Sequence, residues 1–261
     1  MAAPQGRGSV GVVEERLTAL DATFLEDIKR AGDKAAEKAG HEARKPTGET
    51  LVKLTALKER FEATIKELKA HEKSVEGLSA SVKRLNGDHA FLLQLLDGSK
   101  PCSDENITGL ENNLGGVVGE WEVAKREKNL VGVNQKFDGA GGEIDIDVLS
   151  DNGKLWVEVK NEKPSMVENN WDDKTKDDGA GGKKVVYEGH FNQIKGLIDG
   201  AAQKLKPRSK ALAKTEPAES VKIVFVQGLP KVAKVIAQLK QLQEYAKVKK
   251  ITLVIEPPLP S

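Results

Sequence analysis

The amino-acid sequence predicts a mixed α/β protein, in which a central mixed sheet is flanked by helices and preceded by an all-helical N-terminal region. Two observations predict this fold. Through the first third of the chain, apolar residues recur at helical spacing. From residue 117 onward, short runs rich in valine and isoleucine alternate with amphipathic segments, in the order strands, helix, strand, helix, strand. Such alternation is typical of a sheet with helices on its faces.

The N-terminal part of the chain is predicted to hold about ten disordered residues, 1–10, followed by a helical region over 11–97. The apolar positions predict separate helices over 12–45, 51–85 and 89–96. The second of these is expected to end at Asn86-Gly87, a typical helix stop. The three helices would form a helical hairpin or three-helix unit, with their apolar stripe as its core.

The remaining chain is predicted to divide into a connector, 98–116, which includes a short helix near 107–113, and an α/β domain, 117–261. Strands are expected over 117–123, 130–133, 142–149, 154–161, 221–226 and 251–255, and helices over 186–205 and 230–248. Between them, the Gly- and Asp-rich segment 162–184 has no clear period and is expected to be a flexible loop.

Composition restricts the location of the protein and its partners. The net charge is +1, so the chain as a whole has no electrostatic attraction to nucleic acid or membrane, although residues 201–250 carry 12 Lys and Arg against 3 Glu. Cys102 is the only cysteine, which excludes an intramolecular disulfide. No apolar run approaches the length of a membrane span and the first residues have no signal-peptide pattern, so we expect an intracellular protein, cytoplasmic or nuclear, without a membrane partner.

The candidate site lies in the stretch GEIDIDVLSDNGKLWVEVKN, residues 142–161. Side chains alternate between the two faces of a strand, so a register that buries the aliphatic residues on one face places Asp145, Glu158 and Lys160 together on the other. Buried acids need a partner. The hairpin is therefore either a surface element with a solvated charged face, a set of charges that satisfy one another, or a site for a hard divalent cation.

The third alternative suits the hydrolysis of a phosphodiester. Asp145, Glu158 and the backbone carbonyl of Val159 would hold Mg²⁺ or Mn²⁺, which polarises the phosphate and acidifies a water. Lys160 would orient that water or stabilise the developing negative charge. Gln193, from the following helix, would add a hydrogen bond. His190, one turn earlier, is expected to be exposed at the start of that helix rather than to border the same pocket.

The spacing acid-x₁₂-Glu-x-Lys, within GEIDI and VEVK, resembles the PD-(D/E)XK nuclease superfamily, which has the fold of restriction endonucleases and Holliday-junction resolvases. The whole arrangement is similar to an uncharacterised eukaryotic domain family of that superfamily, with a helical N-terminal region. The resemblance covers roughly 117–255 and implies a restriction endonuclease-like sheet. It assigns the metal-binding acid to Asp145, the (D/E)XK motif to residues 158–160, the helix glutamine to Gln193 and an upstream acid to Glu143. Ile144 stands where the superfamily pattern has proline.

The sequence thus predicts a divalent-metal-dependent nuclease acting on DNA or RNA. Phosphate contacts are expected from basic side chains, namely Lys183, Lys184, Lys204, Lys206 and Arg208. Aromatic residues make up 4% of the chain, which favours recognition of backbone and shape. Two alternatives stay open: a nuclease-fold module that no longer cuts and binds nucleic acid or a protein, and assembly with itself or another helical protein through the N-terminal helices.

Overall fold

The computed structural model describes residues 26, 29–31, 33–34, 45–139, 142–177, 183–205 and 207–259. The contacts divide the chain into two compact units, residues 1–56 with 91–107 and residues 57–90 with 108–261. The predicted disorder of residues 1–10 and most of the helix predicted over 12–45 lie outside the described residues.

Three long helices precede the sheet in the chain: α2 (Gly48–His71), α3 (Leu78–Leu96) and α4 (Asp104–Ala124). The predicted end of a helix at Asn86-Gly87 is wrong, because Asn86 Nδ2 donates to the Val82 carbonyl and α3 continues past both residues. The break lies earlier, at Gly77, whose φ of +85° favours glycine. A Cβ there would lie 2.0 Å from the Val133 carbonyl oxygen, so the close approach of the chain also requires glycine.

The strand predicted over 117–123 is also wrong, because α4 covers these residues. Valine and tryptophan favour strands in general, but that preference is readily overridden by burial on a helical face. Five buried apolar residues of α4 are spaced by three or four positions: Leu110, Leu114, Val117, Trp121 and Ala124. Most of the predicted connector is therefore the first half of a helix.

The predicted mixed sheet is confirmed. Its five strands are β1 (Gly132–Gly139), β2 (Gly142–Ser150), β3 (Leu155–Lys160), β6 (Ser220–Phe225) and β7 (Thr252–Glu256). They lie in the order β1-β2-β3-β6-β7, with the first three antiparallel and the last three parallel. The predicted turn between β2 and β3 is a short 3-10 segment, η1 (Asp151–Gly153), in which Asn152 has a φ of +57°.

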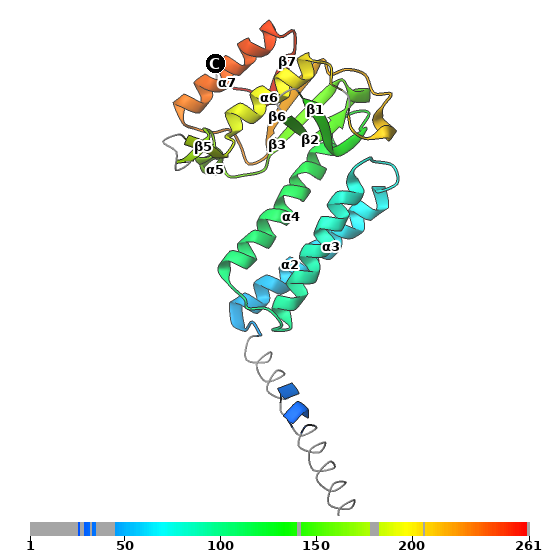
Figure 1. The fold of residues 1–261 in the computed structure, drawn as a ribbon, viewed down its shortest axis with the longest axis vertical. Helices are drawn as coiled ribbons and strands as arrows, with labels where there is room; N and C mark the ends of the chain where they lie inside the picture. The colour runs from blue at the N-terminus through cyan, green and yellow to red at the C-terminus, as the bar shows by residue number, and fades with distance from the viewer. Residues whose placement is uncertain are drawn as a thin grey trace, which may run out of the picture. The chain divides into compact units, whose positions relative to one another are not determined.

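Helices α6 (His190–Ala202) and α7 (Ala233–Val248) cover one face of the sheet (Figure 1). The core under them includes Trp156, Ile194, Ile198, Ile223 and Leu239. Buried valines on β2, β3 and β6 form the opposite face: Val148, Val157, Val159 and Val224. Strands β2, β3 and β6 are therefore buried on both faces, and charged groups within them need partners, whereas β7 leaves Thr252 and Val254 exposed.

The segment expected to be a flexible loop contains regular structure in its described part. It holds α5 (Pro164–Asn169), β4 (Lys174–Asp177) and the start of β5 (Lys183–Tyr187), which pairs with β4. Trp171 is 1% exposed and its indole nitrogen donates to Gln238 Oε1 on α7 at 2.9 Å. A buried tryptophan thus ties this segment to the core. Among the described helices, none has the length and hydrophobicity of a membrane span.

Candidate functional site

Strands β2 and β3 form a fork with a carboxylate inside it. Their ladder joins 148–150 of β2 to 155–157 of β3. Beyond the ladder, the Val159 N–H donates to Asp147 Oδ2 at 2.6 Å, so a side-chain carboxylate accepts the bond that a strand carbonyl would otherwise take. The half-buried Asp147 is therefore fixed next to the end of β3, which carries the predicted Glu158 and Lys160.

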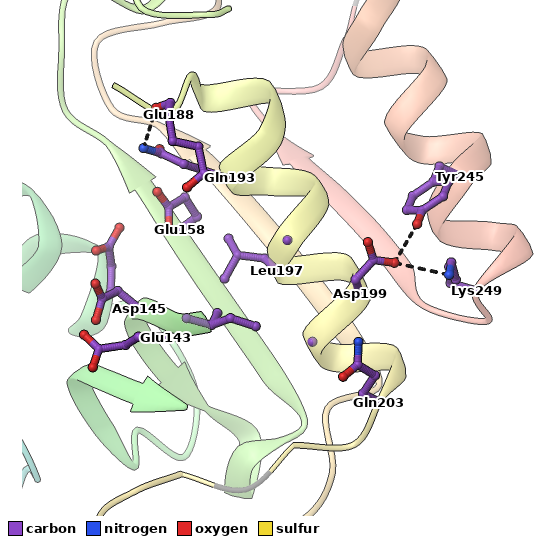
Figure 2. A pocket seen from close by; sticks show the side chains of 14 residues that line it. Glu143, Asp145, Glu158, Glu188, Gln193, Leu197, Asp199, Gln203, Tyr245 and Lys249 are labelled. Atoms are coloured by element: carbon purple, nitrogen blue, oxygen red, sulfur yellow. Dashed lines mark hydrogen bonds and ion pairs between the residues drawn. The ribbon is translucent and has the colours of Figure 1, made fainter. Parts of the chain in front are cut away.

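Lys160 is buried and has two partners. Its Nζ lies 2.5 Å from Glu158 Oε1 and donates to Gln193 Oε1 at 3.0 Å. Gln193 comes from α6, and its Nε2 donates to the Glu188 carbonyl oxygen at 3.0 Å (Figure 2). An ammonium group only donates, so Lys160 fixes the orientation of the Gln193 amide. The structure thus brings together three of the four predicted catalytic residues.

His190 is next to Gln193 and is buried, contrary to the expectation of an exposed side chain. Its Nδ1 is 3.2 Å from Gln193 Oε1 and its Nε2 is 3.4 Å from Glu162 Oε2. The hydrogen bond from His190 is the main cause that lowers the pKa of Glu162. A chain of polar contacts therefore runs from Glu162 through His190 and Gln193 to the Lys160 ammonium group.

The structure does not bring Asp145 into contact with Glu158. The Asp145 side chain is 69% exposed and its Oδ1 lies 3.6 Å from Lys136 Nζ on β1. Asp147, two residues later, occupies the place between β2 and β3 that the sequence argument gave to Asp145. The catalytic role of Asp145 stays a prediction, as does the metal-binding role of the Val159 carbonyl.

The reason for this shift by two residues is an irregular pleat in β2. Strict alternation would place Ile146 and Leu149 on opposite faces, but both belong to the hydrophobic cluster under α6. Across from this point on β1, Asn134 has a φ of +49°, which a regular strand does not contain. The alternation is thus interrupted at Asp147, and the sequence shows no sign of the interruption.

A third carboxylate, Glu120, joins the site from α4 and was missed by the sequence argument, which expected a strand there. Its pKa is raised by burial, and repulsion from Glu158 adds to this, whereas Arg84 and a hydrogen bond from Asn134 oppose it. Its Oε2 is buried and has no hydrogen-bond partner. Such an orphan acceptor costs free energy unless a proton or a cation satisfies it.

Asp147 has the most perturbed carboxyl group of the site. Burial raises its pKa well above the ordinary value, and repulsion from Glu158 and Glu120 raises it further, against the opposing effects of Lys160 and the Val159 N–H. Burial alone would lower the pKa of Lys160, but attraction to Glu158 outweighs it and the pKa is raised. The site thus gathers three mutually repelling carboxylates around one ammonium group.

The chemistry of these donors fits a hard divalent cation, although their present spacing does not form a finished metal site. Among the described residues, no group of three or more His, Cys, Asp or Glu side chains is placed to hold a metal ion. The orphan Glu120 oxygen and the repulsion among Glu120, Asp147 and Glu158 are nevertheless what a bound cation would relieve. In the structure Lys160, rather than a metal cation, neutralises Glu158.

Asp147, Glu158 and Gln193 line a cleft of about 700 Å³ between β2, β3 and α6 (Figure 2), whereas Lys160 is buried beside it and Glu120 lines a separate small cavity with Val117 and Asn134. Glu143 and Asp145, from β2, lie on the same side of the cleft as Glu158. The wall on α6 includes Gly196, Leu197 and Gly200. The candidate site is therefore open to a ligand considerably larger than a metal ion.

The predicted phosphate-binding side chains do not gather at this cleft. Arg208 is held in ion pairs with Asp138 and Glu143 at the β1–β2 edge. Lys204 is exposed after the end of α6. Lys206 and the side chains of Lys183 and Lys184 lie outside what the structure describes. The role of these five residues stays a prediction.

Helix α4 is held next to the site by a close approach that only glycine permits. Asn161, directly after β3, donates to the Gly115 carbonyl, and a Cβ at Gly119 would lie 2.6 Å from the Asn161 side chain. We expect Gly119→Ala to lower the free energy of unfolding by about 1–3 kcal/mol, because the new methyl group must displace Asn161. Urea unfolding measures this effect.

Gly116→Ala is the matched control on the same helix, since a Cβ at Gly116 meets nothing within 4 Å. It is expected to leave stability unchanged or raise it by about 0.5–1 kcal/mol, because alanine favours a helix. Equal losses in the two variants would contradict the packing of Gly119 against Asn161 and the placement of Glu120 that follows from it.

The fold and the site together define a mixed α/β protein with a cluster of carboxylates and one lysine in a cleft beside a five-stranded sheet. No protein-family model matches the chain, and neither the curated proteins nor the solved structures contain a match.

Proposed function

We propose that this protein is a divalent-metal-dependent phosphodiester hydrolase that acts on DNA or RNA, with a restriction endonuclease-like α/β fold as in the PD-(D/E)XK superfamily. The observation that carries the proposal is the fork between β2 and β3. It places Asp147 beside Glu158 and Lys160, with the orphan carboxylate oxygen of Glu120 nearby. Asp147 and Glu158 on adjoining strands line an open cleft, with Lys160 buried beside them, and this arrangement suits catalysis better than structural support.

Each group has a role that its environment supports. Glu120, Asp147 and Glu158 would hold Mg²⁺ or Mn²⁺, which when bound supplies positive charge to the phosphate and acidifies a water. The Lys160 ammonium group donates a hydrogen bond to the negative charge that develops on the phosphate oxygens. Gln193, held by Glu188 and His190, keeps that ammonium group in place.

The second candidate is a module with this fold that binds nucleic acid or a protein without cutting. The 2.5 Å contact between Lys160 and Glu158 favours it, because these two groups satisfy each other without a metal ion. Assembly through the N-terminal helices is a separate possibility, which the mass of the particle in solution tests.

A cleavage panel separates the two candidates. Single- and double-stranded DNA and RNA and branched DNA are incubated with Mg²⁺ or Mn²⁺ and with wild type or Glu158→Ala/Lys160→Ala. We expect wild type to cut at least one substrate and the double variant to cut none. Intact substrates with a folded wild-type protein would reject the hydrolase in favour of the binding module, and equal cutting by both proteins would show that the activity does not come from this site.

A further inference from the structure

The cleft that begins at Asp147 and Glu158 ends at a cluster of different chemistry on α6 and α7. Tyr245 Oη donates to Asp199 Oδ1 at 2.5 Å, and Lys249 Nζ lies 3.2 Å from the same oxygen (Figure 2). The exposed Lys195 Nζ is 5.5 Å from the centroid of the Tyr245 ring, and Lys249 Nζ is 5.3 Å from it. Two ammonium groups are therefore held around one aromatic ring.

This cluster contrasts with the rest of the cleft. Among the described residues that line it, Lys249 is the one basic side chain, and the acids near the other end are Glu143, Asp145, Asp147, Glu158 and Glu188. The partners Lys136, Lys160 and Arg208 offset only part of the acidic charge at that end, and Asp199 offsets one of the two lysines at the other. Phosphate groups would therefore be repelled at the acidic end unless cations are bound there, but would be attracted at the end with Lys249 and Lys195. The charge along the cleft thus favours a chain of phosphates that is anchored away from the carboxylates.

The wall between the two ends leaves room for such a chain. A Cβ at Gly196 would meet nothing within 4 Å, so the middle of the cleft is not filled by side chains from this position. The volume of about 700 Å³ is in the range of sites for small molecules. A few nucleotides of one strand fit this description, whereas the stacked pairs of a duplex do not offer a free base to an aromatic ring.

We propose that Lys195, Lys249 and Tyr245 form a subsite for an unpaired nucleic-acid strand, with the two ammonium groups on backbone phosphates and the phenol ring against a base. This inference rests on the proposed function, which places the scissile phosphodiester beside Asp147 and Glu158. Stacking of a base on an aromatic ring is available to unpaired strands of any sequence. The subsite therefore selects single strands over duplexes, with little preference for sequence.

Binding is measured separately from cutting by fluorescence anisotropy, with a short fluorescein-labelled oligothymidine strand and the corresponding duplex. Ca²⁺ supplies the divalent charge, and a gel verifies that the strand stays intact. We expect wild type to prefer the single strand. Lys195→Ala/Lys249→Ala should weaken binding roughly tenfold and reduce the slope of log K against log[salt] by about 1.4, or ~0.7 for each phosphate contact.

Two matched controls test the assignment. Lys240→Ala/Lys247→Ala removes two exposed lysines of α7 that do not line the cleft and should leave affinity and slope unchanged. Tyr245→Ala should weaken binding at least about fivefold, whereas Tyr245→Phe keeps the ring and should bind like wild type.

The inference is overturned if wild type binds no strand, if it prefers an acidic peptide such as polyglutamate, or if the Lys195/Lys249 variant keeps the wild-type affinity and slope. Its failure is distinct from that of the proposed function. If the wild-type protein cuts but the Lys195→Ala/Lys249→Ala variant binds the strand normally, only the subsite is contradicted. If the protein binds the strand through these lysines but cuts nothing, the hydrolase proposal is contradicted and the subsite is supported.

Discussion

Lys160→Met is expected to abolish cleavage, with a loss of at least about a hundredfold in rate, and to destabilise the protein. The loss of activity follows because one donor aimed at a developing negative charge is worth roughly 10²–10³ in rate. The loss of stability follows because Glu158, with 13% of its side chain exposed, would be left buried without its ion-pair partner. Breaking a buried ion pair by removing one partner costs about 3–5 kcal/mol.

The double variant Glu158→Gln/Lys160→Met separates the two effects. It replaces the ion pair by two neutral side chains of similar size, so most of the lost stability should return while cleavage stays absent. Urea unfolding and cleavage rates are measured on the same preparations. A stable Lys160→Met variant that cuts at the wild-type rate would contradict the catalytic role, and a double variant as unstable as the single one would contradict the pairing seen here.

Much of the sheet could be predicted because its strands have strong local signals. The continuous apolar runs at 221–226 and 251–255 predict buried strands. The structure has β6 and β7 there, but β7 is buried on one face only, because Thr252 and Val254 are exposed. The helices at 186–205 and 230–248 follow from their apolar spacing and correspond to α6 and α7. In each case one pattern fits a single type of element.

Glu120 could have been predicted from the sequence, because the spacing of the apolar residues in its segment is helical although the composition of that segment favours a strand. The residues around it are rich in valine and tryptophan, which predicts a strand by propensity. The spacing from Leu110 through Leu114 and Val117 to Trp121 is helical and extends a pattern that begins before residue 117. Periodicity over several turns is the stronger signal, because it reflects which side chains are buried.

The choice between Asp145 and Asp147 could not have been made from the sequence. Both acids precede Glu158 by a similar number of residues in the sequence, and both belong to a regular GEIDID pattern. The outcome depends on the irregular backbone at Asn134 on β1 and on where the ladder between β2 and β3 ends. Both are properties of strand pairing, which residues far apart in the sequence determine together.

Asp147→Asn is expected to raise stability at neutral pH while it lowers cleavage by at least about a hundredfold. The pKa of Asp147 is raised by burial and by its acidic neighbours, so the folded protein favours the protonated carboxyl group. The contribution of Asp147 to stability is therefore fully present below its unfolded pKa, about 3.9, and is lost as pH rises through the higher folded pKa. An asparagine cannot ionise and avoids this loss, for a gain of roughly 1–2 kcal/mol at neutral pH.

The difference in stability between wild type and Asp147→Asn should thus be small near pH 4 and grow as pH rises. Asp145→Asn is the matched control, because Asp145 is exposed and outside the fork. It should leave stability within about 0.5 kcal/mol of wild type, as is usual for exposed positions, and change cleavage only a few-fold. Unfolding curves in urea across this pH range measure both variants.

The same pair of variants tests the metal site without reference to catalysis. A cation that binds only the folded protein stabilises it by about 2.7 kcal/mol at one hundred times its dissociation constant. Added Mg²⁺ or Mn²⁺ should therefore raise the melting temperature of wild type and of Asp145→Asn, but not that of Asp147→Asn, because only Asp147 adjoins Glu158 and Glu120 in the fork. If instead Asp145→Asn loses the response and Asp147→Asn keeps it, the original assignment to Asp145 is right, and the fork binds a proton rather than a metal ion.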